Sequence, residues 1–460
     1  MKEVYIVFPD SSTSNNIYSF SEVFYMSGYL KEKNYEVYIK SISIKDSKKI
    51  QLLENKSVIG VFMWDNYDLI DWLEWFFNNI KSKKLILYGI TIQNYQEELI
   101  EKYDIDAILI KSNNYNDILD GLLEQNNTDE SFNKQLGFFD EELLSAYNIP
   151  IVPILGSRGC INNCTFCPIN CSNNGKYITR KADSIFNDIL VSLKHNKSIF
   201  YFVDSCFVSK DYNNKMRIND LCNMIIKSKL KISFYIETRA DCIEEELFYN
   251  LKKAGLRRVL IGVENFNTEV LRRYNKNITT GNVLEAIKTL KKLNIGIELT
   301  FIMFDPFTSF FEIEENLAII IEYDLHKYVP LKGIFRKLIL FPTNNIIELD
   351  SLKCTNSCNN ENLSNNCILD SYEYNIINEK VDVFEKRVNK LIDKYVTEEK
   401  LIIQHICSIN DKKTEEHIMN KTFLKYIKEF VMEQNENYTL LETKIENYLE
   451  SEKKKWINKL

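Results

Sequence analysis

Over the first 125 residues, short apolar runs rich in β-branched residues alternate with longer stretches of mixed apolar and polar residues. The apolar runs are Glu3–Phe8, Tyr35–Ile39, Ser57–Met63, Lys84–Gly89 and Asp106–Ile110. Alternation of this kind predicts parallel strands joined by helices on both faces of one sheet. The polar loop Pro9–Asn16 after the first run is predicted to cap a helix that starts near Ile17. We therefore predict a Rossmann-like parallel sheet over residues 1–125.

A second alternation begins at Ile151. Six strand candidates follow one another: Ile151–Gly156, Ile199–Asp204, Ile232–Glu237, Arg258–Val263, Gly296–Met303 and Gly333–Phe341. Helical stretches lie between them: Ile185–Lys194, Ile218–Lys227, Glu244–Ala254 and Thr280–Leu293. This pattern predicts a (β/α)6 partial TIM barrel over residues 149–345, with its chemistry at the carboxyl ends of the strands.

The remaining segments complete an α/β fold with a helical end. Residues 126–148 are polar and acidic, and we interpret them as a linker between the two sheets. Residues 346–460 begin with a cysteine-containing polar loop and continue with helical periodicity that carries solvated charge on the outer faces.

The composition limits the classes of molecule that we expect this protein to bind. Hydrophobic residues make up 45% of the 460 residues and charged residues 27%, which is typical of a folded globular protein. The net charge of −7 argues against nucleic acid as the main partner. No stretch of about 18 uncharged apolar residues is present to span a membrane, and the first apolar run is too short for a signal peptide. We expect a cytoplasmic protein whose 11 cysteines serve metal or sulfur chemistry.

The segment GSRGCINNCTFCP places Cys160, Cys164 and Cys167 directly after the first strand of the second alternation. Three thiolates at this spacing can ligate three irons of a cubane cluster and leave the fourth iron open to an external ligand. A zinc site is the first alternative, although no second cysteine pair lies nearby in the sequence. The other alternative is a fully ligated electron-transfer cluster that uses Cys171 as fourth ligand.

This cysteine motif, with the aromatic Phe166 before its last cysteine, resembles that of the radical S-adenosylmethionine (SAM) superfamily, and the resemblance covers about Ile151–Phe341. It implies that Cys160, Cys164 and Cys167 hold a catalytic [4Fe–4S] cluster whose open iron is chelated by SAM. It further implies that an electron from the cluster cleaves SAM to a 5′-deoxyadenosyl radical, with a low-potential donor such as ferredoxin or flavodoxin as partner. Phe166 is then a cofactor-binding residue.

The same resemblance assigns SAM-binding residues at three strand ends. In FYFVDSCF, Asp204 and Ser205 occupy the position that binds the SAM ammonium, and in YIETRAD, Glu237 and Arg239 resemble the pair that reaches the ribose and the methionine carboxylate. Glu264, in GVEN, is placed near the ribose hydroxyls or the substrate. Considered alone, each of these side chains is as typical of a surface salt bridge or a helix cap as of a SAM-binding site.

Two further segments match the family only in part. The run GIELTFIMFDPFTS resembles the fifth strand and the turn after it, but Phe304–Thr308 lacks both glycines of that turn. The segment LILYGITIQNYQEELIEKYDIDAILI resembles the cobalamin-binding module that precedes many radical SAM barrels. All four histidines lie outside residues 1–125, so the histidine motif that supplies an axial ligand to cobalamin is absent. A domain that binds no cobalamin therefore stays open as an alternative.

The reaction depends on whether the N-terminal domain binds cobalamin. With cobalamin, the resemblance implies methyl transfer to an unactivated carbon of a peptide or specialised metabolite. Without it, the radical leads to epimerisation, cross-linking or rearrangement. Methylthiotransferases of the superfamily carry three cluster cysteines in their N-terminal domain, whereas the first cysteine here is Cys160, so we set that class aside.

The sequence context of the other cysteines gives weaker indications of their function. Cys354, Cys358 and Cys367 lie in an Asn- and Ser-rich loop, where a second iron–sulfur cluster, zinc and free thiols are the alternatives. Cys407 follows in the helical region. We predict that Cys206, Cys222 and Cys242 are small buried hydrophobes, with Cys206 as a candidate lining residue of the SAM site.

Overall fold

The computed structural model describes residues 2–9, 17–42, 56–61, 84–88, 107–110, 139–146, 149–167, 169, 177–340, 374–404, 409–433 and 437–457. Its first part is a five-stranded, all-parallel sheet in the order β2-β1-β3-β4-β5. The strands are β1 (Lys2–Pro9), β2 (Tyr35–Ile42), β3 (Ser57–Val61), β4 (Lys84–Tyr88) and β5 (Ala107–Ile110). This order is the flavodoxin-like one, and it confirms the predicted Rossmann-like sheet.

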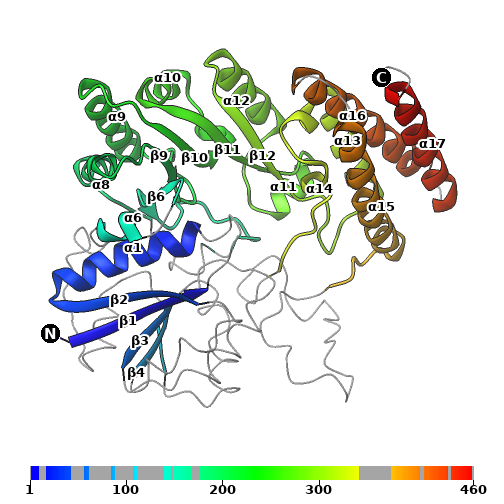
Figure 1. The fold of residues 1–460 in the computed structure, drawn as a ribbon. Coiled ribbons are helices and arrows are strands. Elements are labelled where there is room, and N and C mark those ends of the chain that lie inside the picture. Colours follow the sequence, from blue (N-terminus) through cyan, green and yellow to red (C-terminus); the bar gives the residue numbers. More distant parts are fainter. Residues whose placement is uncertain are drawn as a thin grey trace.

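Helix α1 (Ile17–Glu32) connects β1 to β2 and begins at the predicted residue. Residues 21–30 of this helix are all buried. Figure 1 shows why, because α1 lies between the first sheet and the β6 region of the second. A helix that is covered on two sides is apolar around most of its circumference.

The second sheet is also five-stranded and parallel, in the order β12-β11-β10-β9-β6. Its strands are β6 (Val152–Ile154), β9 (Ile199–Phe202), β10 (Ser233–Arg239), β11 (Leu256–Glu264) and β12 (Gly296–Phe301). Helices α8 (Ala182–Lys194), α9 (Tyr212–Lys227), α10 (Glu245–Ala254) and α12 (Thr280–Lys292) cover its outer face (Figure 1). The shorter elements are α6 (Glu142–Ala146), the antiparallel pair β7 (Ser157–Arg158) and β8 (Ile178–Thr179), η5 (Ala240–Cys242) and α11 (Thr268–Arg273).

The predicted sixth strand, Gly333–Phe341, is wrong as far as residue 340. Gly333 lies in the short helix α14 (Leu331–Ile334), and the extended chain that follows makes one parallel bridge, between Phe304 and Lys337. The apolar run supports both structures, because the two ends of α14 are buried at helical spacing while burial alternates at residues 338–340. In the described residues the barrel is therefore a five-stranded sheet with two additional parallel bridges, Val208 to Thr238 and Phe304 to Lys337.

The end of the chain is helical, as predicted. Helices α15 (Glu379–Gln404), α16 (Ile409–Met432) and α17 (Tyr438–Ile457) pack on one another, and α16 also contacts α13 (Phe310–Glu322) and η6 (Leu325–Lys327) (Figure 1). Phe384, Tyr395 and Phe423 form part of the shared core. None of the described helices is long and apolar enough to cross a membrane.

Candidate active site

The cysteine loop leaves the second sheet at the carboxyl end of β6. Gly159, with φ of +77°, reverses the chain between β7 and Cys160, a conformation that favours glycine. Cys160, Cys164 and Cys167 are half-buried. The backbone N and Nδ2 of Asn162 both donate to Cys160 Sγ, at 3.5 and 3.2 Å. Thr165 N donates to the carbonyl of residue 274 at 3.1 Å, which ties the loop to the segment after α11.

The three thiols are held in their protonated form until a metal replaces the protons. Burial raises the pKa of Cys164, and it raises that of Cys167 to about 12. A hydrogen bond with Cys206, together with burial, raises the pKa of Cys160. The positive charges of Lys276 and Arg239 act in the opposite direction on Cys164. Metal binding must supply the free energy of deprotonation, and the two cations reduce that cost.

These residues fit an iron–sulfur cluster by their chemistry. The donors are soft thiols from a single loop, and cationic groups stand beside them to offset the negative charge of a thiolate-ligated cluster. Among the residues that the structure describes, no three His, Cys, Asp or Glu side chains lie close enough to hold a single metal ion. A cubane is a different case, because each thiolate binds a separate iron.

Asp204 and Ser205, after β9, lie in contrasting environments. Ser205 is exposed, whereas Asp204 is fully buried. The Asp204 carboxylate accepts hydrogen bonds from Gly156 N, at 2.9 Å, and from the Ser157 hydroxyl. A Cβ at Gly156 would lie 2.9 Å from Asp204 Oδ1, so glycine is required for this approach. Burial raises the pKa of Asp204 to about 6. Asp204 thus fixes the end of β6 to the end of β9, and its role toward SAM stays a prediction.

Glu237 and Arg239 both lie on β10, and only Glu237 is half-exposed. Glu237 accepts a hydrogen bond from the hydroxyl of Tyr201. The Arg239 guanidinium is buried, pairs with Asp241 through Nε at 3.0 Å, and lies with Nη1 3.8 Å from Cys164 Sγ. Lys210 Nζ reaches the same Asp241 carboxylate at 2.6 Å. Arg239 therefore lies against Cys164 of the cysteine loop, a contact that its sequence motif does not predict.

Glu264 ends β11 in a strained conformation. Its φ of +68° is uncommon for a side chain of this size, and it falls where the register with β12 shifts. Its carbonyl accepts from Ile302 N at 2.7 Å, and its carboxylate accepts from Thr300 Oγ1 at 2.9 Å and Lys276 Nζ at 3.0 Å. Glu264 is 8% exposed, so this is a buried site rather than a surface salt bridge.

Lys276 links Glu264 to the cysteine loop. Its side chain is buried, with 5% of the residue exposed, and Nζ lies 5.7 Å from the centre of the Phe166 ring. Although burial opposes it, the Glu264 carboxylate and the Cys164 sulfur raise the pKa of Lys276, so the ammonium stays charged. Sequence reasoning missed this residue, which ends the segment LRRYNK at residues 271–276. Nothing in that polar context marks a lysine as buried.

The turn after β12 forms without the two glycines of the family pattern. Asp305 is fully buried, and its carboxylate accepts from Phe307 N at 2.8 Å and from Arg273 Nη2 at 2.7 Å. Asp305 N in turn donates to Thr308 Oγ1 at 2.7 Å. These side-chain hydrogen bonds provide the turn that glycine conformations would otherwise supply.

Four of the predicted site residues come together around Lys276: Cys164, Phe166, Arg239 and Glu264. Cys206 and Cys242 are buried, as predicted, and Cys206 lies at the Cys160 end of the loop. Cys222 is also buried. Several predictions fall outside the described residues, namely those on Cys171, Cys354, Cys358, Cys367, Cys407 and the polar loop before Ile17.

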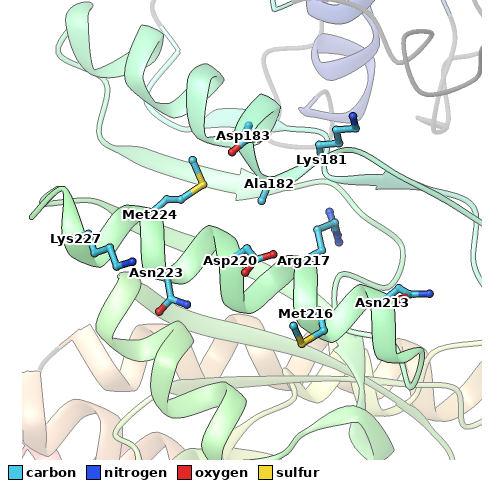
Figure 2. A pocket seen from close by; sticks show the side chains of 10 residues that line it. All are labelled: Lys181, Ala182, Asp183, Asn213, Met216, Arg217, Asp220, Asn223, Met224 and Lys227. Atoms are coloured by element: carbon cyan, nitrogen blue, oxygen red, sulfur yellow. The ribbon is translucent and has the colours of Figure 1, made fainter.

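A cavity of about 580 Å³ lies elsewhere, between α8 and α9. Figure 2 shows its lining from both helices, including Asp183, Asp220 and Arg217, and none of the predicted site residues contributes. Arg217 connects it to the site indirectly, because Nη1 donates to the Gly156 carbonyl at 3.0 Å. This cavity thus lies between two of the helices that cover the outer face of the sheet.

Comparison with known proteins gives a family match over part of the chain. Residues 154–318 match the model of the Radical SAM superfamily. The chain is 26% identical over 301 residues to a 4′-phospho-dehydrooxetanocin synthase from Priestia megaterium, covering 55% of this chain and 40% of that protein. It is 26% identical over 273 residues to the ribosomal protein methylthiotransferase RimO from Clostridium botulinum, covering 56% and 60%. RimO belongs to the class set aside above. The chain spans less than two thirds of these relatives.

Two solved structures share the fold. A cobalamin-dependent S-adenosylmethionine radical enzyme, OxsB, with aqua-cobalamin and S-adenosylmethionine bound, aligns with a TM-score of 0.71 at 17% identity, covering 93% of this chain and 72% of that one. The radical S-adenosylmethionine methyltransferase TsrM from Kitasatospora setae, with cobalamin and a [4Fe–4S] cluster bound, aligns with a TM-score of 0.59 at 12% identity, covering 75% and 74%. At 93% coverage, the likeness to OxsB extends over both sheets.

Proposed function

We propose, from the premise that this chain belongs to the radical SAM superfamily through residues 154–318, that it reductively cleaves SAM at a [4Fe–4S] cluster held by Cys160, Cys164 and Cys167. The observation that carries this proposal is the placement of the three cysteines. They lie in one loop at the carboxyl end of β6, where chemistry is located in folds of this kind, and the Arg239 guanidinium is buried against Cys164.

When bound, the cluster supplies the electron that cleaves the SAM sulfonium to a 5′-deoxyadenosyl radical. The residues of this chain have supporting roles. The three cysteines give up their protons to become ligands, and the charges of Arg239 and Lys276 stabilise the Cys164 thiolate. Glu264 keeps the Lys276 ammonium in place at 3.0 Å.

We propose that SAM lies against the strand ends beside this loop. Ser205 and Glu237 have exposed or half-exposed polar groups for it, while the buried side chains of Asp204, Arg239 and Glu264 orient the segments around them. Phe166 lines the same side, as its contact with Lys276 indicates. A low-potential donor such as ferredoxin or flavodoxin is the proposed source of electrons.

We further propose that residues 1–125 form a cobalamin-binding-like domain, followed by a linker (126–148), the barrel (149–345) and the C-terminal region (346–460) of a cytoplasmic protein. The strand order of the first sheet and the likeness to OxsB and TsrM support this assignment. The corresponding reaction is cobalamin-dependent methylation of carbon in a peptide or specialised metabolite. Cobalamin-independent epimerisation, cross-linking or rearrangement is the other outcome of the tests below.

The proposed SAM cleavage is tested on protein reconstituted anaerobically with iron and sulfide. We expect dithionite and SAM to yield 5′-deoxyadenosine, a Cys164→Ala variant to yield none, and a Cys171→Ala variant to retain the activity. Loss of both cluster and nucleoside in the Cys171→Ala variant would instead favour an electron carrier with four protein ligands. An iron content of about eight per chain rather than four would assign a second cluster to Cys354, Cys358 and Cys367.

Cobalamin is tested separately by absorbance after incubation with hydroxocobalamin and gel filtration. Retention of about one cobalamin per chain supports methyl transfer. Its absence, together with continued 5′-deoxyadenosine formation, supports the cobalamin-independent reactions.

A further inference from the structure

Helix α1 belongs to the first sheet but makes a buried ion pair with β7, the short strand that leads into the cysteine loop. The Glu22 carboxylate lies 2.6 Å from Arg158 Nη2, and the two side chains are 6% and 4% exposed. Only Gly159 separates Arg158 from Cys160. A charge pair in this environment is desolvated, so either partner left alone would be an uncompensated buried charge.

One turn further along the same helix, Tyr25 contacts the other end of this segment. Its hydroxyl accepts from Leu155 N at 3.2 Å and from Arg180 Nη1 at 3.0 Å, and donates to Asp188 Oδ2 at 2.8 Å. Arg180 lies over the Tyr25 ring, with 4.7 Å from guanidinium carbon to ring centre, and donates to the Leu155 carbonyl at 2.9 Å. Side chains of α1 thus contact both ends of Leu155–Arg158, Tyr25 through the Leu155 amide and Glu22 through the Arg158 guanidinium.

We infer that α1 is a positioning element of the cluster site: through Glu22 and Tyr25 it fixes Leu155–Arg158, and thereby the start of the cysteine loop. The N-terminal sheet would then be needed to form the SAM-cleaving centre as well as for any cobalamin or substrate contact. The part of this inference that concerns the cluster rests on the proposed function, whereas the part that concerns the loop does not. Figure 1 shows α1 in the corresponding place, alongside β6.

The opposite end of α1 supplies a matched control. Lys31 Nζ pairs with Asp140 at 2.8 Å and with Glu142 at 2.7 Å, in the segment before β6. These contacts also join α1 to a distant part of the chain, but none of them involves the cysteine loop. Lys31→Met therefore removes a charged contact of α1 and leaves the Glu22 and Tyr25 contacts intact.

The experiment measures hydrogen exchange by mass spectrometry on the full-length apoprotein, so its main readout needs no cofactor. In Glu22→Gln and Arg158→Met, we expect peptides covering residues 155–167 to exchange at least about tenfold faster, with little change at β11 and β12. We expect the double variant to add little to the single variants, because both remove one interaction. Tyr25→Phe keeps the ring and removes only the hydroxyl, so it covers the case in which a charge variant fails to fold.

Unchanged exchange in all three single variants, or an equal increase in Lys31→Met, would overturn the inference. A second readout is iron retained after reconstitution and gel filtration, which we expect to fall at least about twofold in Glu22→Gln and not in Lys31→Met. Failure of the proposed function appears differently, as wild-type protein that releases no 5′-deoxyadenosine although its loop exchanges slowly.

Discussion

The strand ends around the cysteine loop and helix α15 both bury ionisable groups, but Glu399 of α15 lacks the kind of partner that Lys276 and Arg239 have. Lys276 lies 3.0 Å from Glu264, and Arg239 lies 3.0 Å from Asp241. In the helices, Glu399 Oε1 is buried with no hydrogen-bond partner among the described residues. Burial and the nearby Glu416 raise the pKa of Glu399 to about 8. Paired burial thus keeps charge in place at neutral pH, which a site for a charged cofactor needs, whereas unpaired burial removes it.

The largest effect on stability is expected from Lys276→Met. It leaves the Glu264 carboxylate buried without its cation, which should cost about 3–5 kcal/mol. Urea unfolding of the apoprotein measures this loss. Lys210→Met is the control, because Lys210 is 61% exposed in its side chain and Asp241 keeps Arg239 as a partner. Equal destabilisation by the two variants would show that the buried ion pair contributes no more to the free energy of unfolding than the exposed lysine does.

Glu399→Gln tests the other side of the comparison. Between about pH 4.5 and about 8 the folded protein keeps a proton on Glu399 that the unfolded chain has lost, so the free energy of unfolding should fall as pH rises through this window. The glutamine variant should flatten that slope and gain several kcal/mol near pH 8, at about 1.4 kcal/mol per pKa unit. Urea midpoints between pH 5 and 8 measure it, and parallel curves for wild type and variant would contradict the account.

Asp204→Asn should have a smaller effect. The amide can accept from only one of the two donors, Gly156 N and the Ser157 hydroxyl, so the other is left unpaired at a cost of about 1–2 kcal/mol. The neighbouring Ser205→Ala, at an exposed position, should stay within about 0.5 kcal/mol of wild type. A destabilisation confined to Ser205→Ala would reverse the roles assigned to the two residues.

The sequence predicts most of the fold and the cysteine loop, because both depend on local pattern. Hydrophobic alternation is enough to place ten strands in two parallel sheets, and the spacing of Cys160, Cys164 and Cys167 specifies its chemistry without tertiary context. It fails at residues 333–340, where one apolar run satisfies both helical and strand periodicity.

The electrostatics of the site could not be predicted in the same way. Lys276 and Asp241 lie in polar segments that resemble surface loops, and only the tertiary fold places their side chains, each 6% exposed, against Glu264 and Arg239. The pair between Glu22 and Arg158 joins residues 136 positions apart, so no local pattern contains it. Partner choice between distant charges depends on tertiary contacts that periodicity does not encode.

The measurement that tests the central claim most directly is electron paramagnetic resonance of the reduced, reconstituted protein with and without SAM. If Cys160, Cys164 and Cys167 hold a cluster with one open iron, we expect a reduced [4Fe–4S] signal whose g values shift when SAM is added, because SAM becomes a ligand. The shift should be absent in Cys164→Ala. A full-strength cluster signal in wild-type protein that SAM leaves unchanged, at SAM concentrations up to the millimolar range, would contradict the account.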